Sequence, residues 1–258
     1  MIRLKTKEEL LIMREAGKIV SCALDALRDV VRPGVSTAEL ERVVEKHIAA
    51  SDGKAAFKGY RPSHADRPFP GAICASVNGE VVHGIPNDGR ILDEGDIVSV
   101  DVGVFFRGYY GDAACTYPVG IIDPNRSKLL KITEKSLELA IAASVKGNTV
   151  GDIGYAVENY VQANGFGVVR DYAGHGVGKK LHEAPQIPNF GQRGRGATLQ
   201  RGMTLAIEPM VVAGKEDVML GLDGWVVVTA DGSDAAHFER TIVITDDGPE
   251  ILTPWISL

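Results

Sequence analysis

The stretch IVSVDVGVFFRGYYGDAACTY (97–117) decides the fold. Apolar residues recur in it at a period of two on both sides of a short polar and glycine-containing break. This pattern is typical of two β-strands joined by a tight turn. We therefore predict a hairpin that turns near Phe105–Gly108 and places Asp101 and Asp112 roughly opposite each other.

The two aspartates are unusual residues for such a hairpin. Aspartate is poorly suited to a strand interior, and two carboxylates among apolar side chains repel each other and are costly to bury. A bound cation removes both objections, so we interpret Asp101 and Asp112 as metal ligands. The alternative is a pair of exposed turn residues, which is reasonable for Asp112 beside Gly111 but weak for Asp101 within apolar sequence.

Outward from the hairpin, the sequence alternates between helical and extended patterns. The apolar spacing predicts helices over 7–31, 36–51, 126–146 and 149–164, and further strands over 72–77, 203–212, 225–229 and 236–245. The order of two helices followed by strands thus occurs twice along the chain. This order predicts a mixed α/β (α+β) fold.

The two predicted helix pairs resemble an internal repeat. The segment GVSTAELERVVEKHIAA (34–50) aligns with GNTVGDIGYAVENYVQA (147–163), with glycine, hydroxyl and acidic residues at matching positions. Capped amphipathic helices can also resemble one another by chance. We predict a single catalytic domain (1–258) built from two similar halves, about 1–122 and 123–258, with a site in the cleft between them.

Three histidines lie in sequence that suits a site. His175 lies between two glycines in YAGHGVGKKLHEAP, where backbone and ligand can approach closely, and His182 follows in the same segment. His83 ends an apolar strand in VNGEVVHGIP. A single histidine is more often structural than functional, so each of them is an open candidate when taken alone.

Two glutamates lie inside apolar strands and need a partner there. Glu208 precedes a proline in MTLAIEPMVV, and Glu239 lies in AHFERTIVIT. Arg240 could form an ion pair with Glu239, which is the alternative to a metal-binding role. Together with the aspartates and one histidine, these glutamates form a set of four carboxylates and one imidazole. Such a set suits hard or borderline divalent ions and can neutralise two of them.

Composition narrows the function classes. The net charge of −6 argues against general binding to nucleic-acid phosphates, which needs clustered lysine and arginine. Three cysteines without metal-type or disulfide-type spacing indicate a reducing compartment. The charged N-terminal sequence does not read as a secretion signal, and no apolar run is long enough to span a membrane. We expect a cytoplasmic protein with no membrane and no nucleic-acid partner.

Taken in order, the segments VNGEVVHGIP, VDVG, GYYGDAACTY, GHGVGKKLHEAPQI, IEPM, DGW and FERTIVIT closely resemble those of the type I methionine aminopeptidases. The resemblance covers nearly the whole chain. It implies the pita-bread fold, in which two pseudo-symmetric halves carry antiparallel sheet and outer helices. It also implies two divalent metal ions as cofactors, without choosing among manganese, iron and cobalt.

The resemblance implies a role for each site residue. The implied metal ligands are Asp101, Asp112, His175, Glu208 and Glu239, with Asp112 and Glu239 shared by both ions. The implied catalytic residues are His83, His182 and Glu208. His182 would stabilise the oxyanion, His83 would contact the scissile amide nitrogen or assist the leaving amine, and Glu208 would carry the proton. A small apolar pocket for methionine is implied at Tyr60, Cys74 and Trp225.

The implied activity is removal of the initiator methionine from new proteins when the second residue is small, by attack of metal-activated water on the first peptide bond. The partners would be nascent polypeptide N-termini, with the ribosome as a further candidate, and we expect a monomer. The segment RPSHADRPFPGA (61–72) looks longer than the corresponding loop in many members, which leaves substrate preference open near the pocket mouth.

Two rival functions are open. One is a proline-specific dipeptidase or aminopeptidase of the same fold, although these usually carry a large domain before the catalytic one. The other is a metal-free binding protein of that fold, although such proteins lose ligands that this chain retains.

Overall fold

The computed structural model describes residues 2–62 and 65–257, and the predicted hairpin lies at its centre. Strand β4 (Ile97–Phe106) pairs antiparallel with β5 (Tyr109–Pro118) over their full length. The connection is two residues long, Arg107 with φ 47° and Gly108 with φ 91°. Positive φ at both positions matches the right-handed twist of the strands, so the turn prediction is confirmed.

The register of this hairpin corrects one prediction. Asp101 lies opposite Ala114, and Asp112 lies opposite Gly103. The two aspartates are therefore diagonal neighbours, not directly opposite each other. Because side chains alternate between faces, residues 101 and 103 share a face, and both carboxylates still project from the same side of the hairpin.

The four predicted helices are present, with small shifts at their ends: α1 (Lys7–Leu27), α2 (Thr37–Ala49), α3 (Pro124–Ala143) and α4 (Val150–Ala163). Thr6 caps α1 through a capping box with Glu9. Helix α3 begins two residues earlier than predicted because Asp123 caps it and proline suits the first helical position. None of the helices within the described residues combines the length and apolar character needed to cross a membrane.

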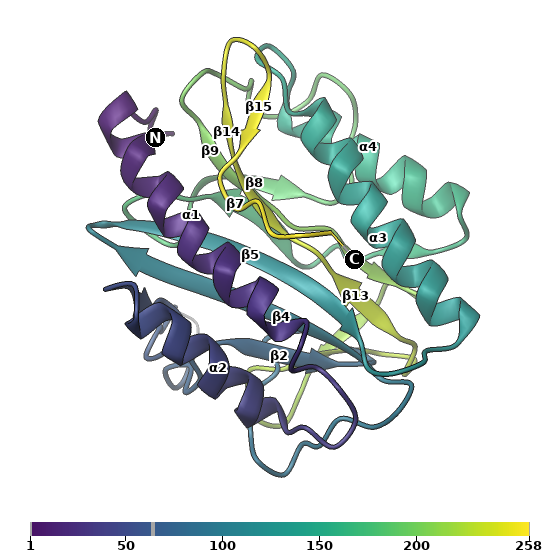
Figure 1. Ribbon diagram of the computed structural model, residues 1–258. Coiled ribbons are helices and arrows are strands. Elements are labelled where there is room, and N and C mark those ends of the chain that lie inside the picture. The colour runs from purple at the N-terminus through teal and green to yellow at the C-terminus, as the bar shows by residue number, and fades with distance from the viewer. Residues whose placement is uncertain (1, 63–64, 258) are drawn as a thin grey trace.

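The helices flank the strands in two pairs (Figure 1). Helix α1 packs on β4 and β5 through buried Met13, Ala16, Val20 and Leu24 and lies beside α2. On the other side, α3 packs against α4. The core between the two pairs is apolar, and the outer helix faces are polar. This is the predicted mixed α/β architecture with outer helices.

The remaining strands form four small sheets with the hairpin, and every pairing is antiparallel. In the first half these strands are β1 (Lys54–Ala55), β2 (Cys74–Val77) and β3 (Glu80–Val82). In the second half they are β6 (Gly167–Val168), β7 (Ala173–Gly176), β8 (Glu183–Pro188), β9 (Thr204–Ile207), β10 (Met210–Val212), β11 (Val218–Leu220), β12 (Val227–Thr229), β13 (Ala235–His237), β14 (Arg240–Ile244) and β15 (Pro249–Ile251).

Two predicted strands are each interrupted, and both interruptions lie at candidate ligands. The segment 203–212 divides into β9 and β10 at Glu208, and 236–245 divides into β13 and β14 at Glu239. Strand β9 pairs with β14 in one sheet, while β10 pairs with β13 in another. The two segments thus pass together from one sheet to the next, with a glutamate at each crossing point. The proline after Glu208 has no N–H for a continuous ladder.

The two halves share local detail. Ser36 caps α2 and forms a single antiparallel bridge to Ile91, while Thr149 caps α4 and forms the same type of bridge to Thr198. These matching contacts support the predicted repeat. Strand β3 of the first half joins β11 and β12 of the second, so sheet pairing crosses between the halves. The division at about residue 122 stays a prediction.

Candidate metal centre

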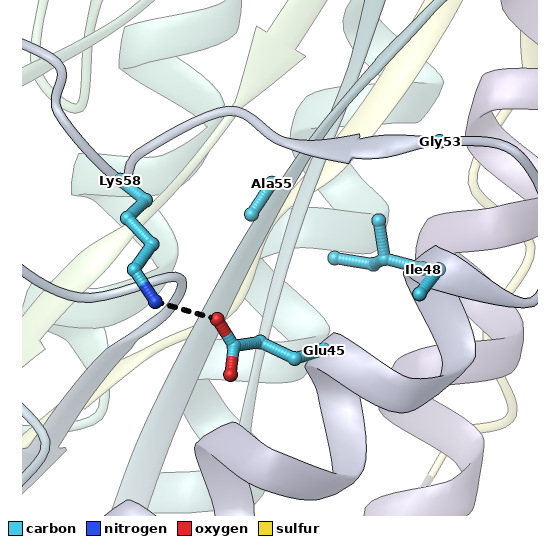
Figure 2. A pocket seen from close by; sticks show the side chains of 6 residues that line it. Glu45, Ile48, Gly53, Ala55 and Lys58 are labelled. Carbon is cyan, nitrogen blue, oxygen red and sulfur yellow. Dashed lines mark hydrogen bonds and ion pairs between the residues drawn. The ribbon is translucent and has the colours of Figure 1, made fainter.

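A small surface hollow of ≈ 370 Å³ lies between the end of α2 and β1 (Figure 2). It is lined by Glu45, Ile48, Ala49, Gly53, Ala55 and Lys58. Its two charged side chains pair with each other, with Lys58 Nζ 2.8 Å from Glu45 Oε1. Since its charges are satisfied and it contains no cluster of titratable groups, this hollow does not compete as a catalytic site.

A much larger cleft of ≈ 1370 Å³ collects every residue predicted for the site. These residues are Tyr60, Cys74, His83, Asp101, Asp112, His175, His182, Glu208, Trp225 and Glu239. They come from segments that are far apart in the sequence and from both predicted halves. The fold therefore brings together residues that the sequence analysis identified separately, each in its own motif.

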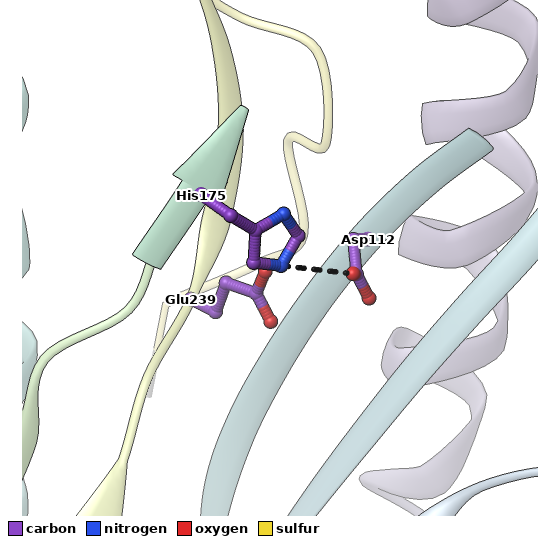
Figure 3. Close-up of side chains that lie close together, drawn as sticks. All are labelled: Asp112, His175 and Glu239. Carbon is purple, nitrogen blue, oxygen red and sulfur yellow. Dashed lines mark ion pairs between the residues drawn. The ribbon is translucent and has the colours of Figure 1, made fainter. Parts of the chain in front are cut away.

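Asp112, His175 and Glu239 line this cleft and lie close together (Figure 3). Asp112 projects from β5, His175 projects from β7, and Glu239 lies at the break between β13 and β14. One ligand atom from each of the three lies within 4.8 Å of the others. Glu208 adjoins them, with Oε1 3.5 Å from His175 Nε2. This spacing suits coordination of a cation.

The buried carboxylates of the cluster would be stabilised by positive charge placed between them. One oxygen each of Asp101, Asp112 and Glu239 is buried without a hydrogen-bond partner within the described part of the chain. Burial raises the pKa of Asp101 to about 7. Burial and then neighbouring carboxylates raise the pKa values of Asp112, Glu208 and Glu239 well above their usual range. Cations between these groups would satisfy the orphaned oxygens and the charge together.

The tautomer of His175 also suits a metal ligand. Its Nδ1 lies 2.9 Å from the Gly176 carbonyl oxygen, so Nδ1–H donates there and Nε2 carries a lone pair. Burial, followed by the nearby His182, lowers the pKa of His175 to about 3, so the ring is neutral at physiological pH. Nε2 nevertheless faces Asp112 Oδ2 at 3.7 Å. Two acceptors facing each other at this distance are stabilised by a cation placed between them.

The glycines beside His175 have a structural reason. A Cβ on Gly174 would meet the Ala206 carbonyl oxygen at 2.5 Å, and a Cβ on Gly176 would meet the Ala184 carbonyl oxygen at 2.3 Å. Strand β7 lies between β8 and β9 in its sheet. Both glycines therefore let β7 approach its neighbours closely while it presents the imidazole to the cleft.

The two other predicted histidines lie beside the cluster. The ring of His182 is 4.3 Å from the ring of His175, centroid to centroid, and burial lowers the pKa of His182. The Tyr60 hydroxyl oxygen lies 2.7 Å from His182 Nδ1. His83 has φ 62°, an uncommon value for a non-glycine residue that concentrates at functional sites. Its ring contacts Trp225 edge-on at 6.3 Å between centroids.

One end of the cleft is apolar. Its walls are formed by a buried cluster of Phe57, Phe69, Cys74, Leu181 and Trp225. Phe69 meets Trp225 edge-on at 5.1 Å, and β2 places Cys74 directly opposite Asp101 of β4. An apolar pocket thus adjoins the carboxylates, and its role in holding a methionine side chain stays a prediction.

The segment 61–72 lies at the cleft mouth, and its residues 63–64 are outside the described part of the chain. Arg67 of this segment donates a hydrogen bond to the Asp223 carbonyl on the opposite side. This contact joins the described part of the segment to the second half of the chain beside the cleft.

His237 is a site residue that the sequence analysis missed. It is buried at the end of β13, and its Nε2 lies 3.8 Å from Glu208 Oε2 without a hydrogen-bond partner among the described residues. Burial, and then His83, lower the pKa of His237 to about 3, so it is neutral at physiological pH. The signal available in the sequence was its position two residues before Glu239 in an extended segment.

Two alternatives from the sequence are wrong. Asp112 is buried in β5 and is not an exposed turn residue. Arg240 does not form an ion pair with Glu239 in the described structure. Its guanidinium stacks on the Trp255 ring at 4.1 Å and donates a hydrogen bond to the Trp255 carbonyl oxygen. Glu239 is buried, and its carbonyl accepts a hydrogen bond from Trp255 Nε1 at 2.9 Å. The Glu239 carboxylate is therefore available to the cluster that it forms with Asp112 and His175.

Comparison with known proteins agrees with this geometry. The model of metallopeptidase family M24 matches residues 12–246. A methionine aminopeptidase of Clostridium acetobutylicum is 48% identical over 253 residues, which is 98% of this chain and 99% of that protein. Methionine aminopeptidase 1 of Bacillus subtilis has the same identity and coverage. The crystal structure of methionine aminopeptidase from Thermotoga maritima superposes with a TM-score of 0.95 at 49% identity, covering 98% of this chain and 99% of that one.

A more distant structure defines the extent of the shared fold. The Xaa-Pro dipeptidase from Bacillus anthracis has a TM-score of 0.78 at 22% identity, and the match covers 99% of this chain but 63% of that one. The pita-bread fold is thus common to the methionine aminopeptidases and to this dipeptidase. The high sequence identities are to the methionine aminopeptidases. The chain belongs to metallopeptidase family M24 and, within that family, to the methionine aminopeptidases.

Proposed function

We propose that this chain removes the N-terminal methionine from newly made proteins whose second residue is small. The observation that carries the proposal is a single cleft in which a carboxylate–imidazole cluster directly adjoins a small apolar pocket. The cluster suits the hydrolysis of a peptide bond, and the pocket suits an unbranched apolar side chain. Substrates are free polypeptide N-termini in the cytoplasm, and the enzyme acts as a monomer. The ribosome is a candidate partner as the source of these chains.

The metal-binding role falls to five side chains. Asp112 and Glu239 would be shared by two divalent ions, Asp101 would serve one ion, and His175 with Glu208 would complete the other. Manganese, iron and cobalt all suit this oxygen-rich set. When bound, such a pair lowers the pKa of a water molecule and polarises a carbonyl group. The buried carboxylate oxygens without a hydrogen-bond partner among the described residues and the lone pair on His175 Nε2 support this assignment.

The other residues bind the substrate and move protons. Glu208 takes a proton from the attacking water and delivers it to the departing amine. The Tyr60 hydroxyl oxygen lies 2.7 Å from His182 Nδ1. In the tautomer in which this hydroxyl donates to Nδ1, Nε2–H of His182 would donate to the scissile carbonyl oxygen. His83 assists the leaving amine. Tyr60, Cys74 and Trp225 surround the methionine side chain, which explains why bulkier or charged first residues would fit poorly.

Peptide cleavage tests the proposal. The metal-free protein is reloaded with one metal at a time and given Met-Gly-Met-Met and, separately, Leu-Pro-type dipeptides. We expect release of methionine from the first peptide and no cleavage of the second. The reverse result would favour a proline dipeptidase, the function named for the Bacillus anthracis protein of the same fold. No cleavage of either peptide with any metal would favour a binding protein.

The role of His182 predicts a specific kinetic change. In His182→Ala, kcat on Met-Gly-Met-Met should fall by roughly 10²-fold, because an oxyanion donor acts in the transition state and not in the ground state. His47→Ala, which removes a histidine on α2 that does not line the cleft, is the matched control and should keep normal rates. A change in His182→Ala confined to KM would contradict the oxyanion role.

A further inference from the structure

An exposed apolar patch lies on the hairpin formed by β11 and β12. Met219 is 53% exposed, Leu220 is 62% exposed, and Leu222 is fully exposed. These three lie within four consecutive residues, 219–222, whereas the other large exposed hydrophobic side chains among the described residues are dispersed along the chain. Exposed apolar clusters of this type commonly mark binding surfaces.

The patch is continuous with the proposed active site. Leu220 and Leu222 line the same cleft as the carboxylate cluster, and Trp225 of the apolar pocket follows three residues after Leu222. The cleft therefore runs from the metal ligands, past the apolar pocket, to this hairpin.

The hairpin has a defined conformation. Gly221 N–H donates to the Val226 carbonyl oxygen at 2.7 Å. The Asp223 carboxylate accepts hydrogen bonds from Trp225 N–H at 2.8 Å and Val226 N–H at 2.9 Å. Strands β11 and β12 pair in register on either side of this turn. The exposed leucines are thus held at the cleft mouth by backbone hydrogen bonds, which lowers the entropic cost of using them for binding.

The polypeptide substrate itself is the occupant that fits this position. Only its first residue enters the apolar pocket, and the chain beyond the second residue must leave through the mouth. At ≈ 1370 Å³, the cleft exceeds the ~300–1,000 Å³ that hold a drug-sized ligand, so it has room for several residues. An extended chain advances about 3.3 Å per residue, so the third and following residues pass over the rim.

We propose that Leu220 and Leu222 bind apolar side chains of the substrate at the positions that follow its second residue, so that the enzyme prefers substrates with an apolar early sequence. This inference rests on the proposed aminopeptidase function. It adds a selectivity that acts outside the methionine pocket and that depends on substrate length.

The test uses two long peptides and one short one with the metal-loaded enzyme. The long peptides are Met-Ala-Leu-Leu-Leu-Lys and Met-Ala-Ser-Ser-Ser-Lys, and the readout is the ratio of their kcat/KM values. We expect a ratio of ~5- to 10-fold in favour of the leucine peptide, below the range for a closed apolar pocket. The double variant Leu220→Ser/Leu222→Ser should reduce this ratio to about one. Ile121→Ser, at a residue that is 85% exposed and does not line the cleft, should keep it.

The outcomes separate this inference from the function beneath it. Absence of cleavage of the short peptide Met-Ala-Ser by the wild-type enzyme would refute the proposed function. Cleavage of Met-Ala-Ser together with equal rates on the two long peptides would refute the patch alone, as would an unchanged ratio in the double variant. Sedimentation velocity tests whether a second copy of the chain binds the patch instead. A wild-type protein that is dimeric, together with a double variant that is monomeric, would assign the patch to a dimer interface and overturn the proposal.

Discussion

Glu208→Gln should abolish turnover, with kcat reduced by ~10²- to 10⁴-fold, the range that a general acid–base residue contributes. Glutamine keeps the size of glutamate but cannot accept a proton from water or deliver one to an amine. Glu208 lies at the break between β9 and β10, with one oxygen 3.5 Å from His175 Nε2 and the other 3.8 Å from His237 Nε2. No other carboxylate in the cleft touches both histidines in the described structure.

The fold should survive this substitution. A neutral amide replaces a buried carboxylate whose charge is unfavourable in the absence of cations, so thermal unfolding of the metal-free variant should match or exceed that of the wild type. Glu15→Gln, on the exposed face of α1, is the matched control and should retain full activity. Turnover of Glu208→Gln at a near-normal rate would eliminate the proton-transfer role. Loss of activity together with loss of helical circular dichroism would instead point to a structural role.

The sequence predicted the hairpin well because both of its strands alternate clearly and the turn contains glycine. It did not predict the register, since the turn also uses Arg107 at positive φ, a conformation that non-glycine residues rarely adopt. If the centre of the turn shifts by one residue, the residue opposite Asp101 changes by two positions, here from Asp112 to Ala114. The inference that Asp101 and Asp112 share a site survived because a shift of two positions preserves the face.

The long-range part of the site was less accessible to sequence reasoning. His175, Glu208 and Glu239 come from three segments whose mutual distances no local pattern specifies, so their grouping rested on chemistry and resemblance. Periodicity also predicted unbroken strands through both glutamates, because an isolated acidic residue in an apolar run does not reveal that the strand changes sheets there. His237 was missed for a related reason: a buried histidine looks like an ordinary core residue until its neighbour Glu208 is known.

Removing the metal ions should abolish activity and make stability depend strongly on pH. After dialysis against a chelator, we expect no cleavage of Met-Gly-Met-Met and a lower unfolding temperature at pH 8, with a smaller decrease at pH 5. Burial keeps several carboxylates of the cleft protonated at acidic pH, whereas at pH 8 the folded state must hold their charges without cations. Thermal unfolding with and without added Mn²⁺ at the two pH values measures this difference. An Mn²⁺-induced increase that is equal at pH 5 and pH 8, or absent, would contradict the prediction.

The substitution Asp101→Asn tests whether the buried charge of this carboxylate causes the pH dependence of stability in the metal-free protein. The pKa of Asp101 is raised from 3.8 to about 7 in the folded protein, mainly by burial. Between these values the folded protein keeps a proton that the unfolded chain has released, so the free energy of unfolding falls as pH rises, by up to ~1.4 kcal/mol per pH unit. The amide has no such penalty. Without metal, Asp101→Asn should therefore equal the wild type near pH 4 and exceed it by a few kcal/mol at pH 8.

With Mn²⁺ present the order should reverse, because the variant lacks one ligand and gains less from the metal. Asp247→Asn, at an exposed position, should follow the wild type under both conditions. Urea unfolding at pH 4, 6 and 8 provides the free energies. A metal-free Asp101→Asn protein that is less stable than the wild type at pH 8 would mean that the carboxylate is held by protein contacts alone. In that case the buried negative charge would no longer require cations, and the strongest physical reason for a metal centre in this cleft would be lost.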